Sequence, residues 1–552
     1  MQGSPAGDPC FFLAATILER HLQLANHEAA NNINFVLPVI SPMRKFLAII
    51  LLLMPFLVRS QAAGLVRIEL DAAMNSDIYQ VVPCGSFGVL VFFETKDAPD
   101  DSHRNWHFLL YGKDLEEIWN VDIPVMTGAR FKDYNVNDSL VDLFFLNTDK
   151  VKPGSENFQV VRFDLAQDLS SFTRGILPSE TNFKKVIFNH NRAYLALNMD
   201  NDEAGIYIIN LLNGEVIPYN IVYPDQNFIE DICLDTLDNQ LLCLIGNFLD
   251  RRQNKMYLQA IDLSGQFRYD MEVSTALAGK YLNSGRIFVL RDSSIMILGS
   301  YGSLAAKIPS QNEYFGIESS GVFSTCISHR EQKFMNYYNF MEFNNLRAGV
   351  SARDFYRLQK KKVRETPEYS LNYELLFHEP IIHDTTQILM LEAFYPEFKT
   401  VSDISYDYWG RPVTQTYTVF DGYRLFNTIL AAFDDNGALV WDNSLELNLN
   451  PTVQLMKRAS YYFDGDPSVI FYNDGYRIDY RVYIANSELE GFSKVDIETS
   501  KSGDKITTVG FNSMKYWYDK YFLAYGYQSI TNNLVADKNE RTVFYINKIA
   551  LD

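Results

Sequence analysis

The stretch "AAFDDNGALVWDN", residues 431–443, decides the fold: an aliphatic run is followed by an acidic turn with one glycine and then by a second apolar run. Asp, Asn and Gly accept the backbone angles of a tight turn at low cost, so the stretch predicts two antiparallel strands joined by a hairpin. "AIDLSGQFRYD" (260–270) repeats the pattern. The two turns share an aspartate, a glycine three residues later and an aromatic seven residues later: Asp262, Gly265 and Tyr269, and Asp434, Gly437 and Trp441.

Related hairpins occur at 109–120, 161–172 and 208–220, and their spacing indicates a repeat array. The turn positions Gly112, Asp164, Asn210 and Asp262 lie 52, 46 and 52 residues apart, and units of four antiparallel strands recur at roughly 40–50 residues. Each unit contains a strongly apolar segment that we expect to be its second strand. These segments are 87–94, 140–147, 192–199, 240–247, 294–301, 387–395, 468–475 and 521–528. They are apolar throughout, which is typical of strands covered on both faces.

The two ends of the repeat region complement each other. The last unit ends at "RTVFYINKIALD" (541–552) without a fourth strand, and "GLVRIELD" (64–71) precedes the first complete unit. Supplying the missing strand from the N-terminal side would close a ring and hide the edges of an open sheet. The sequence therefore predicts an all-β fold, a β-propeller of eight blades with seven as the alternative, forming a single domain over 61–552.

The turn pattern resembles the Gly-x-x-x-Trp repeat of the quinoprotein-like propellers. Trp441, and in part Trp119, retain the tryptophan, whereas the turn at 434–437 is one residue shorter. The resemblance covers about 65–552 and implies the architecture alone. It transfers no cofactor residue, so no cofactor is expected. That superfamily includes dehydrogenases and also non-catalytic scaffolds for outer-membrane assembly.

The N-terminal region has the pattern of an export signal. "MRKFLAIILLLMPFLVRSQAAG", which begins at Met43, has a basic start, an apolar run over 46–58 and small residues beyond it, as secretory signals do. We expect a signal peptide at 43–60 cut before Gln61, and an upstream extension without structure at 1–42. An N-terminal anchor helix is the alternative. We expect no transmembrane segment after signal removal, and a location in the periplasm, at the cell surface or outside a Gram-negative bacterium.

Charge and cysteine content narrow the possible partners. Without residues 1–60 the chain retains 45 basic and 65 acidic residues, a net charge of −20, which disfavours nucleic acid because phosphate contacts need clustered Lys and Arg. The solubility of an exported protein explains such acidity. Cys233 and Cys243 flank the turn "DTLDNQ" and form a candidate cross-strand disulfide, with buried free thiols as the favoured alternative.

Two segments interrupt the repeat. Residues 341–369 predict a helical insertion, with Ser351 as a plausible N-cap. Residues 395–424 lie between two strands of the sixth unit, and we expect them to form an inserted loop. The segment is rich in aromatics, which provide rigid contact area with a polar tip. The candidate binding residues are Tyr406, Tyr408, Trp409, Arg411, Tyr417 and Tyr423. The alternative is that they pack onto the propeller as a satellite core.

Motifs for chemistry are scarce. The sequence has no Gly-x-Ser-x-Gly elbow, P-loop or dinucleotide fingerprint. Asn198, Asp200 and Asp202 alternate and are a weak Ca²⁺ candidate, although a plain polar turn is the favoured interpretation. The sequence therefore favours a non-enzymatic binding or scaffold propeller with a protein partner. A glycan-active hydrolase or lyase with a site in the central channel, and a carbohydrate-binding protein that takes a cell-surface glycan, are the alternatives.

Overall fold

In the computed structural model, residues 65–552 form one compact unit, separate from the residues that precede them. The structure describes residues 66–550 except 75–78, 153, 201–202, 251–252, 278, 303–317, 349–370, 464–466, 533 and 535–539. The segments expected to be an extension and a signal peptide lie outside the described residues. Most of the expected helical insertion does too.

Eight antiparallel sheets, here called blades 1 to 8, follow one another along the chain. Blade 1 consists of β2 (Gln80–Pro83), β3 (Val89–Glu94), β4 (His103–Tyr111) and β5 (Glu117–Met126), with the short 3-10 turn η2 (Gly85–Phe87). Blade 2 consists of β6 (Arg130–Asn137), β7 (Leu140–Leu146), β8 (Phe158–Asp164) and β9 (Leu169–Gly175). Blade 3 consists of β10 (Thr181–Asn189), β11 (Arg192–Met199), β12 (Ala204–Asn210) and β13 (Val216–Ile221). Blade 4 consists of β14 (Gln226–Asp235), β15 (Gln240–Asp250), β16 (Gln253–Asp262) and β17 (Phe267–Glu272).

The second half of the ring carries the larger departures from the four-strand unit. Blade 5 consists of β18 (Tyr281–Val289), β19 (Ile295–Gly302), β20 (Gly321–Ser328) and β21 (Glu331–Asn339). Blade 6 has five strands: β22 (Glu374–Phe377), β23 (Ile381–His383), β24 (Thr386–Tyr406), β25 (Pro412–Phe433) and β26 (Leu439–Glu446). Blade 7 consists of β27 (Ala459–Phe463), β28 (Ser468–Asn473), β29 (Arg477–Ile484) and β30 (Ser487–Asp496). Blade 8 consists of β31 (Asp504–Tyr518), β32 (Tyr521–Asn532), β33 (Glu540–Ala550) and β1 (Arg67–Asp71).

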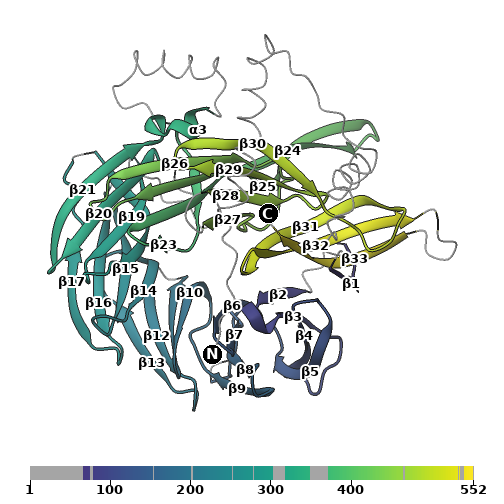
Figure 1. Cartoon of the computed structure of the whole chain (residues 1–552), viewed down its shortest axis with the longest axis horizontal. Coiled ribbons are helices and arrows are strands. Elements are labelled where there is room, and N and C mark those ends of the chain that lie inside the picture. Colours follow the sequence, from purple (N-terminus) through teal and green to yellow (C-terminus); the bar gives the residue numbers. More distant parts are fainter. Residues whose placement is uncertain are drawn as a thin grey trace, which may run out of the picture. The chain divides into compact units, whose positions relative to one another are not determined.

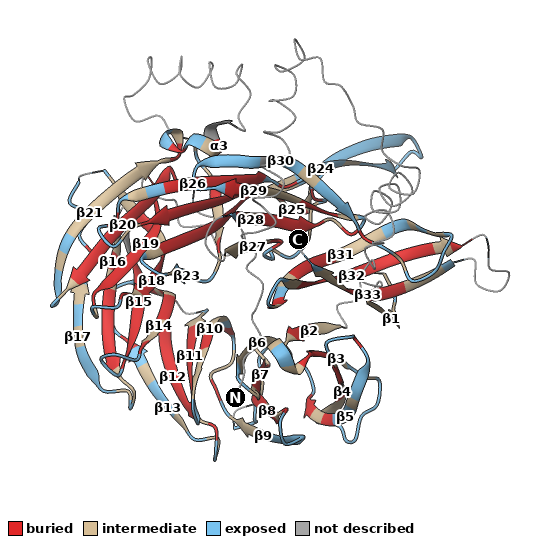
Figure 2. Cartoon of the chain, in the orientation of Figure 1, coloured by how far each residue is buried: buried red, intermediate tan, exposed pale blue. Residues whose placement is uncertain are grey.

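The blades are arranged in a ring (Figure 1), and apolar side chains between successive blades hold it together. Eight buried clusters each join one blade to the next, and one of them joins blade 8 to blade 1. In β7, Leu143 and Phe145 pack in the cluster shared with blade 1, whereas Phe144 and Leu146 pack in the cluster shared with blade 3. Successive side chains of a strand point to opposite faces, so a strand covered on both sides is apolar at nearly every position. The exception in β7, Asp142, is paired with Arg162 of β8 at 2.6 Å. Figure 2 shows this continuous burial along the middle strands of the blades.

The N-terminal strand closes the ring, as the sequence predicts. β1 pairs antiparallel with β33, from Arg67 opposite Asn547 to Asp71 opposite Val543. Trp517 of blade 8 donates its indole N–H to the carbonyl of Gly88 at 2.7 Å, which ties blade 8 to blade 1. The eight-bladed β-propeller is therefore confirmed, and each of the eight expected second strands occupies the second position of its blade.

The repeated turn has one geometry. The Asp434 side chain accepts the N–H groups of Asn436 and Ala438, and Gly437 takes the left-handed conformation, with φ at 70°. Asp262 accepts the N–H groups of Ser264 and Gln266 in the same way. The aspartate supplies the acceptors that the turn needs, and the glycine avoids the strain of positive φ.

Part of the expected helical insertion is described. A 3-10 turn, η3 (Phe340–Glu342), leads into α3 (Asn344–Ala348). Asp442 of β26 accepts the N–H groups of Asn344 and Asn345 at 2.9 and 2.8 Å, so blade 6 caps this helix. The expected cap at Ser351 lies outside the described residues.

Candidate functional site

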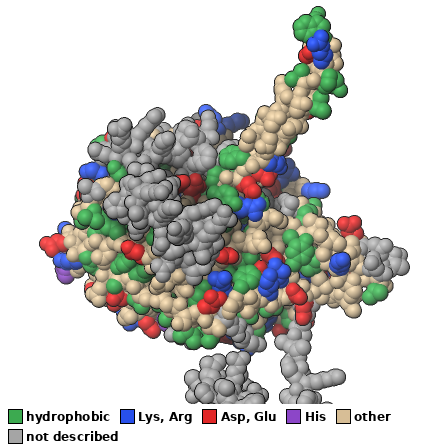
Figure 3. Space-filling model, turned by 90° about the horizontal axis from the view of Figure 1, so that it is seen from above, with side chains coloured by type: hydrophobic (Ala, Val, Ile, Leu, Met, Phe, Trp, Pro, Cys, Tyr) green, Lys and Arg blue, Asp and Glu red, His purple; other side chains and the backbone are tan. Residues whose placement is uncertain are grey.

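The aromatic segment 395–424 is a β-hairpin, which corrects the expectation of a loop. β24 and β25 pair from Gln387 opposite Phe433 out to Tyr406 opposite Pro412, with register shifts after Ala393 and Glu397. Only the inner parts of the two strands belong to blade 6, because β22 pairs with β24 up to Phe394 and β26 pairs with β25 from Asn427 onward. We call the outer part, residues 395–424, the arm. Figure 3 shows the arm standing out from the body of the molecule.

The tip of the arm uses the same turn as the propeller core. The Asp407 side chain accepts the N–H groups of Trp409 and Arg411 at 2.9 and 2.8 Å, and Gly410 has φ at 72°. This turn presents Tyr408 and Trp409 to solvent, with 94% and 75% of their surface exposed. The tip is therefore a well-formed turn that displays two aromatic side chains.

The other predicted binding residues divide between tip and base. Tyr406 and Tyr417 are 73% and 48% exposed, and the guanidinium of Arg411 lies 6.0 Å from the ring centre of Trp409. Tyr423 instead packs edge-on against Phe394 and Phe420, at 5.8 and 5.1 Å between ring centres. The satellite-core interpretation therefore holds at the base, whereas the candidate contact residues lie at the tip and along the outer strands.

The strand register excludes the predicted Cys233–Cys243 disulfide. Cys233 lies opposite Leu242, and Cys243 lies opposite Ile232. A shift of one residue turns a side chain to the other face of a sheet, so the two thiols point into different inter-blade clusters and both cysteines are free. Burial raises the pKa of Cys233 to about 12, which leaves this thiol unreactive at neutral pH.

The weak Ca²⁺ candidate is only partly described. The carboxamide oxygen of Asn198 accepts the N–H of Ile229 at 2.8 Å and so links blade 3 to blade 4. Asp202 lies outside the described residues. Among the described residues no group of three or more His, Cys, Asp or Glu could hold a metal ion.

A set of charged side chains at the centre of the ring was not anticipated from the sequence. The first strands of blades 2 to 5 each carry a β-bulge at the corresponding position, next to Lys132, Lys184, Glu230 and Asn283. A bulge re-aims the side chains beside it. Figure 1 shows these first strands facing the middle of the ring. The bulges therefore place adjacent polar residues on the inner strands of four successive blades.

Side chains at and directly after these bulges contact one another between blades. We call the following set the axial network: Asp133, Lys184, Lys185, Glu230, Asp231, Ser284 and Glu379. Lys184 contacts Glu230 at 3.3 Å and Lys185 contacts Asp231 at 2.8 Å, both between blades 3 and 4. Ser284 of blade 5 donates to Glu230 at 2.8 Å. Lys185 also contacts Glu379 of blade 6 at 2.9 Å. Because blades 3 and 6 are not neighbours, this ion pair crosses the middle of the ring.

The surroundings of the axial network shift the pKa values of two carboxyl groups, Asp133 and Glu379, in opposite directions. Burial, together with the charge of Glu379, raises the pKa of Asp133 to about 6. Burial acts to raise the pKa of Glu379 as well, but the charges of Lys185, Lys457 and Arg286 lower it to about 2. Such divergent carboxyl groups occur in acid–base catalysis. Here Glu379 is paired with two lysines, Lys185 and Lys457, so this carboxylate links blade 6 to its partners across the ring.

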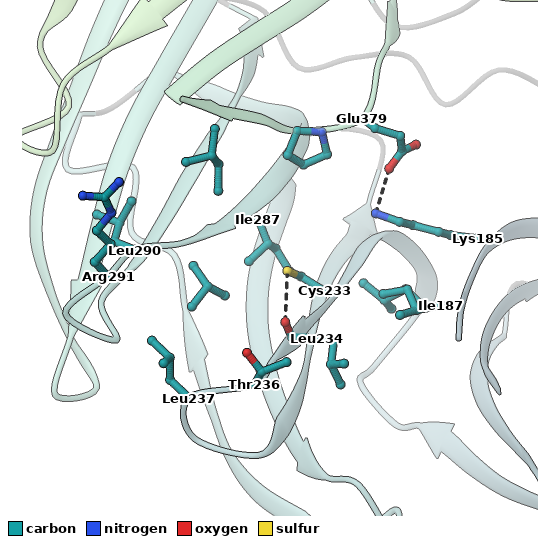
Figure 4. Close-up of a pocket in the computed structure, with 14 residues that line it drawn as sticks. Lys185, Ile187, Cys233, Leu234, Thr236, Leu237, Ile287, Leu290, Arg291 and Glu379 are labelled. Carbon is teal, nitrogen blue, oxygen red and sulfur yellow. Dashed lines mark hydrogen bonds and ion pairs between the residues drawn. The ribbon is translucent and has the colours of Figure 1, made fainter. Parts of the chain in front are cut away.

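An apolar cavity of about 670 Å³ opens beside the axial network. Its walls come from the first strands of blades 3, 4 and 5 and from the segment before β23 (Figure 4). The wall residues include Ile187, Ile232, Leu234, Ile287, Val289 and Ile382. The Lys185–Glu379 ion pair lies at one end and Arg291 lines another part. The cavity is of ligand size, although Lys185 and Glu379 in its lining are paired with each other.

No helix among the described residues has the length and hydropathy that crossing a membrane requires. No protein-family model and no curated protein matches the chain. Among solved structures, the WD40 domain of SCAP from fission yeast is 7% identical over 88% of this chain and 98% of that chain, with a TM-score of 0.38.

Two further structures are similar at the same level. Polysaccharide lyase Uly1 is 10% identical over 87% of this chain and 100% of that chain, with a TM-score of 0.36. The periplasmic gluconolactonase PpgL of Pseudomonas aeruginosa is 9% identical over 76% and 96%, with a TM-score of 0.31. None of these similarities transfers an activity to this chain. The chain is an eight-bladed β-propeller on the strength of its own strand pairing.

Proposed function

We propose that the protein is an exported, non-enzymatic binding propeller that engages a protein partner through the tip of the arm. The observation that carries the proposal is the exposure of Tyr408 and Trp409 on a rigid hydrogen-bonded turn at the end of the arm. Aromatic side chains that dominate binding energy in protein interfaces are typically tyrosine and tryptophan. Holding them on a turn before binding reduces the entropy that binding must overcome.

The composition of the arm supports the same proposal. Between 400 and 420 the charged residues are Asp403, Asp407 and Arg411, in a chain with a net charge of −19. An isolated two-stranded hairpin is marginally stable in water, and this one is exposed on both faces beyond Lys399. A partner that covers the arm would bury its apolar side chains and stabilise it. Export is supported by the signal-like segment at 43–60.

The test shortens the arm without disturbing blade 6. Thr400 lies opposite Thr418, so replacing 401–417 by Asn-Gly should give a tight hairpin in the native register. We expect the shortened protein to melt within a few degrees of wild type and to lose its partner in affinity purification from the native organism. A partner that co-purifies equally well with the shortened protein would refute the proposal.

Point variants separate the tip from the rest of the arm. Tyr408→Ser with Trp409→Ser should weaken partner binding at least thirty-fold, because a hot-spot aromatic contributes about 2 kcal/mol or more. Leu212→Ser is the matched control, since Leu212 is 74% exposed on a turn of blade 3, and it should bind as wild type does. Binding of the wild-type tip to purified glycans, with no protein partner recovered, would favour carbohydrate binding instead. Export is tested separately by fusing 43–60 to a reporter enzyme that is active only outside the cytoplasm.

A further inference from the structure

Arg458 is a buried cation without an acceptor. It precedes β27, the first strand of blade 7, and is 5% exposed. Its guanidinium makes no hydrogen bond and no ion pair with any described residue, and its Nε is fully buried. Arg286, the comparable buried arginine of blade 5, donates to the carbonyls of Glu230, Gly285, Phe377 and His378. Buried charges in folded proteins are normally paired, because leaving one unpaired costs several kcal/mol.

The acidic residue whose charge acts on Arg458 is Glu392, and its carboxylate already accepts hydrogen bonds from other groups. Burial lowers the pKa of Arg458, while the charge of Glu392 acts to raise it. The Glu392 carboxylate is fully buried and accepts the backbone N–H groups of Arg458 and Ala459 at 2.9 and 3.0 Å. It also contacts Nε2 of His378 at 2.6 Å. Glu392 therefore fixes the backbone at the start of β27 and leaves the guanidinium of Arg458 without an acceptor.

The surroundings of the guanidinium are aromatic and come from blade 8. It lies 5.3 Å from the ring centre of Phe511, which a bulge between Val509 and Asn512 places on the first strand of that blade. Tyr525 and Tyr545 also act on its charge. An aromatic ring stabilises a guanidinium through its face and leaves the N–H groups at the edge free to donate.

We propose that Arg458 binds a small oxyanion, a carboxylate or a phosphate, between the first strands of blades 7 and 8. A guanidinium presents parallel N–H donors that match two oxygens of either group. The bound anion would accept the hydrogen bonds that the guanidinium makes to none of the described residues. This site is independent of the arm and of its partner.

Isothermal titration calorimetry of the full chain tests the proposal, with sodium phosphate and sodium acetate as probes and sodium chloride at matched ionic strength as the reference. We expect saturable binding of at least one probe at one anion per chain. Arg458→Met should fold, since an apolar side chain suits this environment, and should bind at least ten-fold more weakly. Arg458→Lys keeps the charge but loses the paired donors, so its affinity should lie between the two.

Arg291→Met is the control, because Arg291 is exposed and pairs with Asp384 on the surface, and this variant should bind as wild type does. A crystal soaked in sodium selenate should show an anomalous peak beside Arg458, which locates the site even if Arg458→Met does not fold. Absence of saturable binding beyond chloride would show that water alone solvates Arg458 and would overturn the proposal. An anomalous peak elsewhere, or unchanged affinity in Arg458→Met, would also overturn it.

Discussion

Removing the amine of Lys185 should test whether the ion pairs at the middle of the ring hold the blades together. Lys185 contacts Asp231 at 2.8 Å and Glu379 at 2.9 Å. The Asp231 side chain is 1% exposed, and its second oxygen accepts the N–H of Ile287 at 3.0 Å. Lys185→Met would leave Asp231 charged, buried and without its cation. Breaking a buried pair in this way costs about 3–5 kcal/mol.

The expected change in melting temperature follows from the size of the unit. Unfolding entropy near 60 °C is about 2.1 cal/mol/K per residue, or about 1 kcal/mol/K for the roughly 490 residues from Leu65 to Asp552. Lys185→Met should therefore melt about 3–5 °C below wild type by differential scanning calorimetry at pH 7. Adding Asp231→Asn removes the unpaired charge and can keep the acceptor for Ile287. The double variant should recover more than half of the loss.

Lys184→Met is the matched control for this experiment. It removes a lysine from the neighbouring position, but its partner Glu230 is 14% exposed and still accepts a hydrogen bond from Ser284. We expect a loss below about 1.5 °C, since partly solvated pairs contribute about 1 kcal/mol or less. Lys185→Met within 1 °C of wild type, or an equal loss in Lys184→Met, would refute the assigned role of the axial network.

Three further predictions concern acidity, a turn and ring closure. Because the pKa of Asp133 rises from 3.8 to about 6 on folding, wild-type stability falls as the pH rises through 6. Asp133→Asn should exceed wild type by on the order of 3 kcal/mol at pH 8 and match it below pH 4 in denaturant titrations. Gly437→Ala should cost more than the roughly 1 kcal/mol of Gly410→Ala, because both turns have positive φ but only Gly437 faces neighbouring atoms where a Cβ would lie. Arg541→Met leaves the fully buried carboxylate of Asp504 without its cation and should speed amide hydrogen exchange in β1.

The sequence was sufficient to predict the repeat and its closure. A strand that is buried on both faces is apolar along most of its length. Segments such as 192–199 can therefore be recognised as second strands, and β11 occupies those same residues. The last unit lacks a fourth strand. Because a closed ring leaves no strand edge unpaired, this gap indicated that 64–71 completes the last blade. The second strands and the closing strand can each be recognised from the composition of a single segment, without knowing how the strands pair.

Features that depend on pairing between segments were harder to predict. The arm was expected to be a loop because it interrupts the repeat between two strands of the sixth unit, yet it is an extended hairpin of paired strands. The turn Asp407–Gly410 has the same aspartate–glycine spacing as Asp434–Gly437. This spacing is the sequence signal that could have predicted the hairpin. The candidate disulfide was wrong, and the favoured interpretation of free thiols is confirmed. β14 and β15 are joined by residues 236–239, so the turn is centred half a residue before Asp238, the midpoint between the two cysteines.

The axial network was missed because two adjacent polar residues in a strand look like an ordinary exposed position. Asp133, Lys185, Asp231 and Ser284 follow their bulges at intervals of 52, 46 and 53 residues, close to the spacing of the repeated turn. Aligning the sequences of the first strands on that spacing would have placed these four residues at equivalent positions. Their mutual contacts depend on how far the blades lie from the middle of the ring, which no local pattern specifies.

The pairing of β1 with β33 has a consequence for biosynthesis. The first strand to leave the ribosome must wait for the last one, since Arg67 and its partner Asn547 are separated by almost the whole repeat region. Seven blades can assemble before β33 is made, but the eighth cannot be completed until β33 has left the ribosome. Until then the nascent protein exposes an unsatisfied strand, the condition in which chaperones bind and chains aggregate. Export before folding would move that final step outside the cytoplasm.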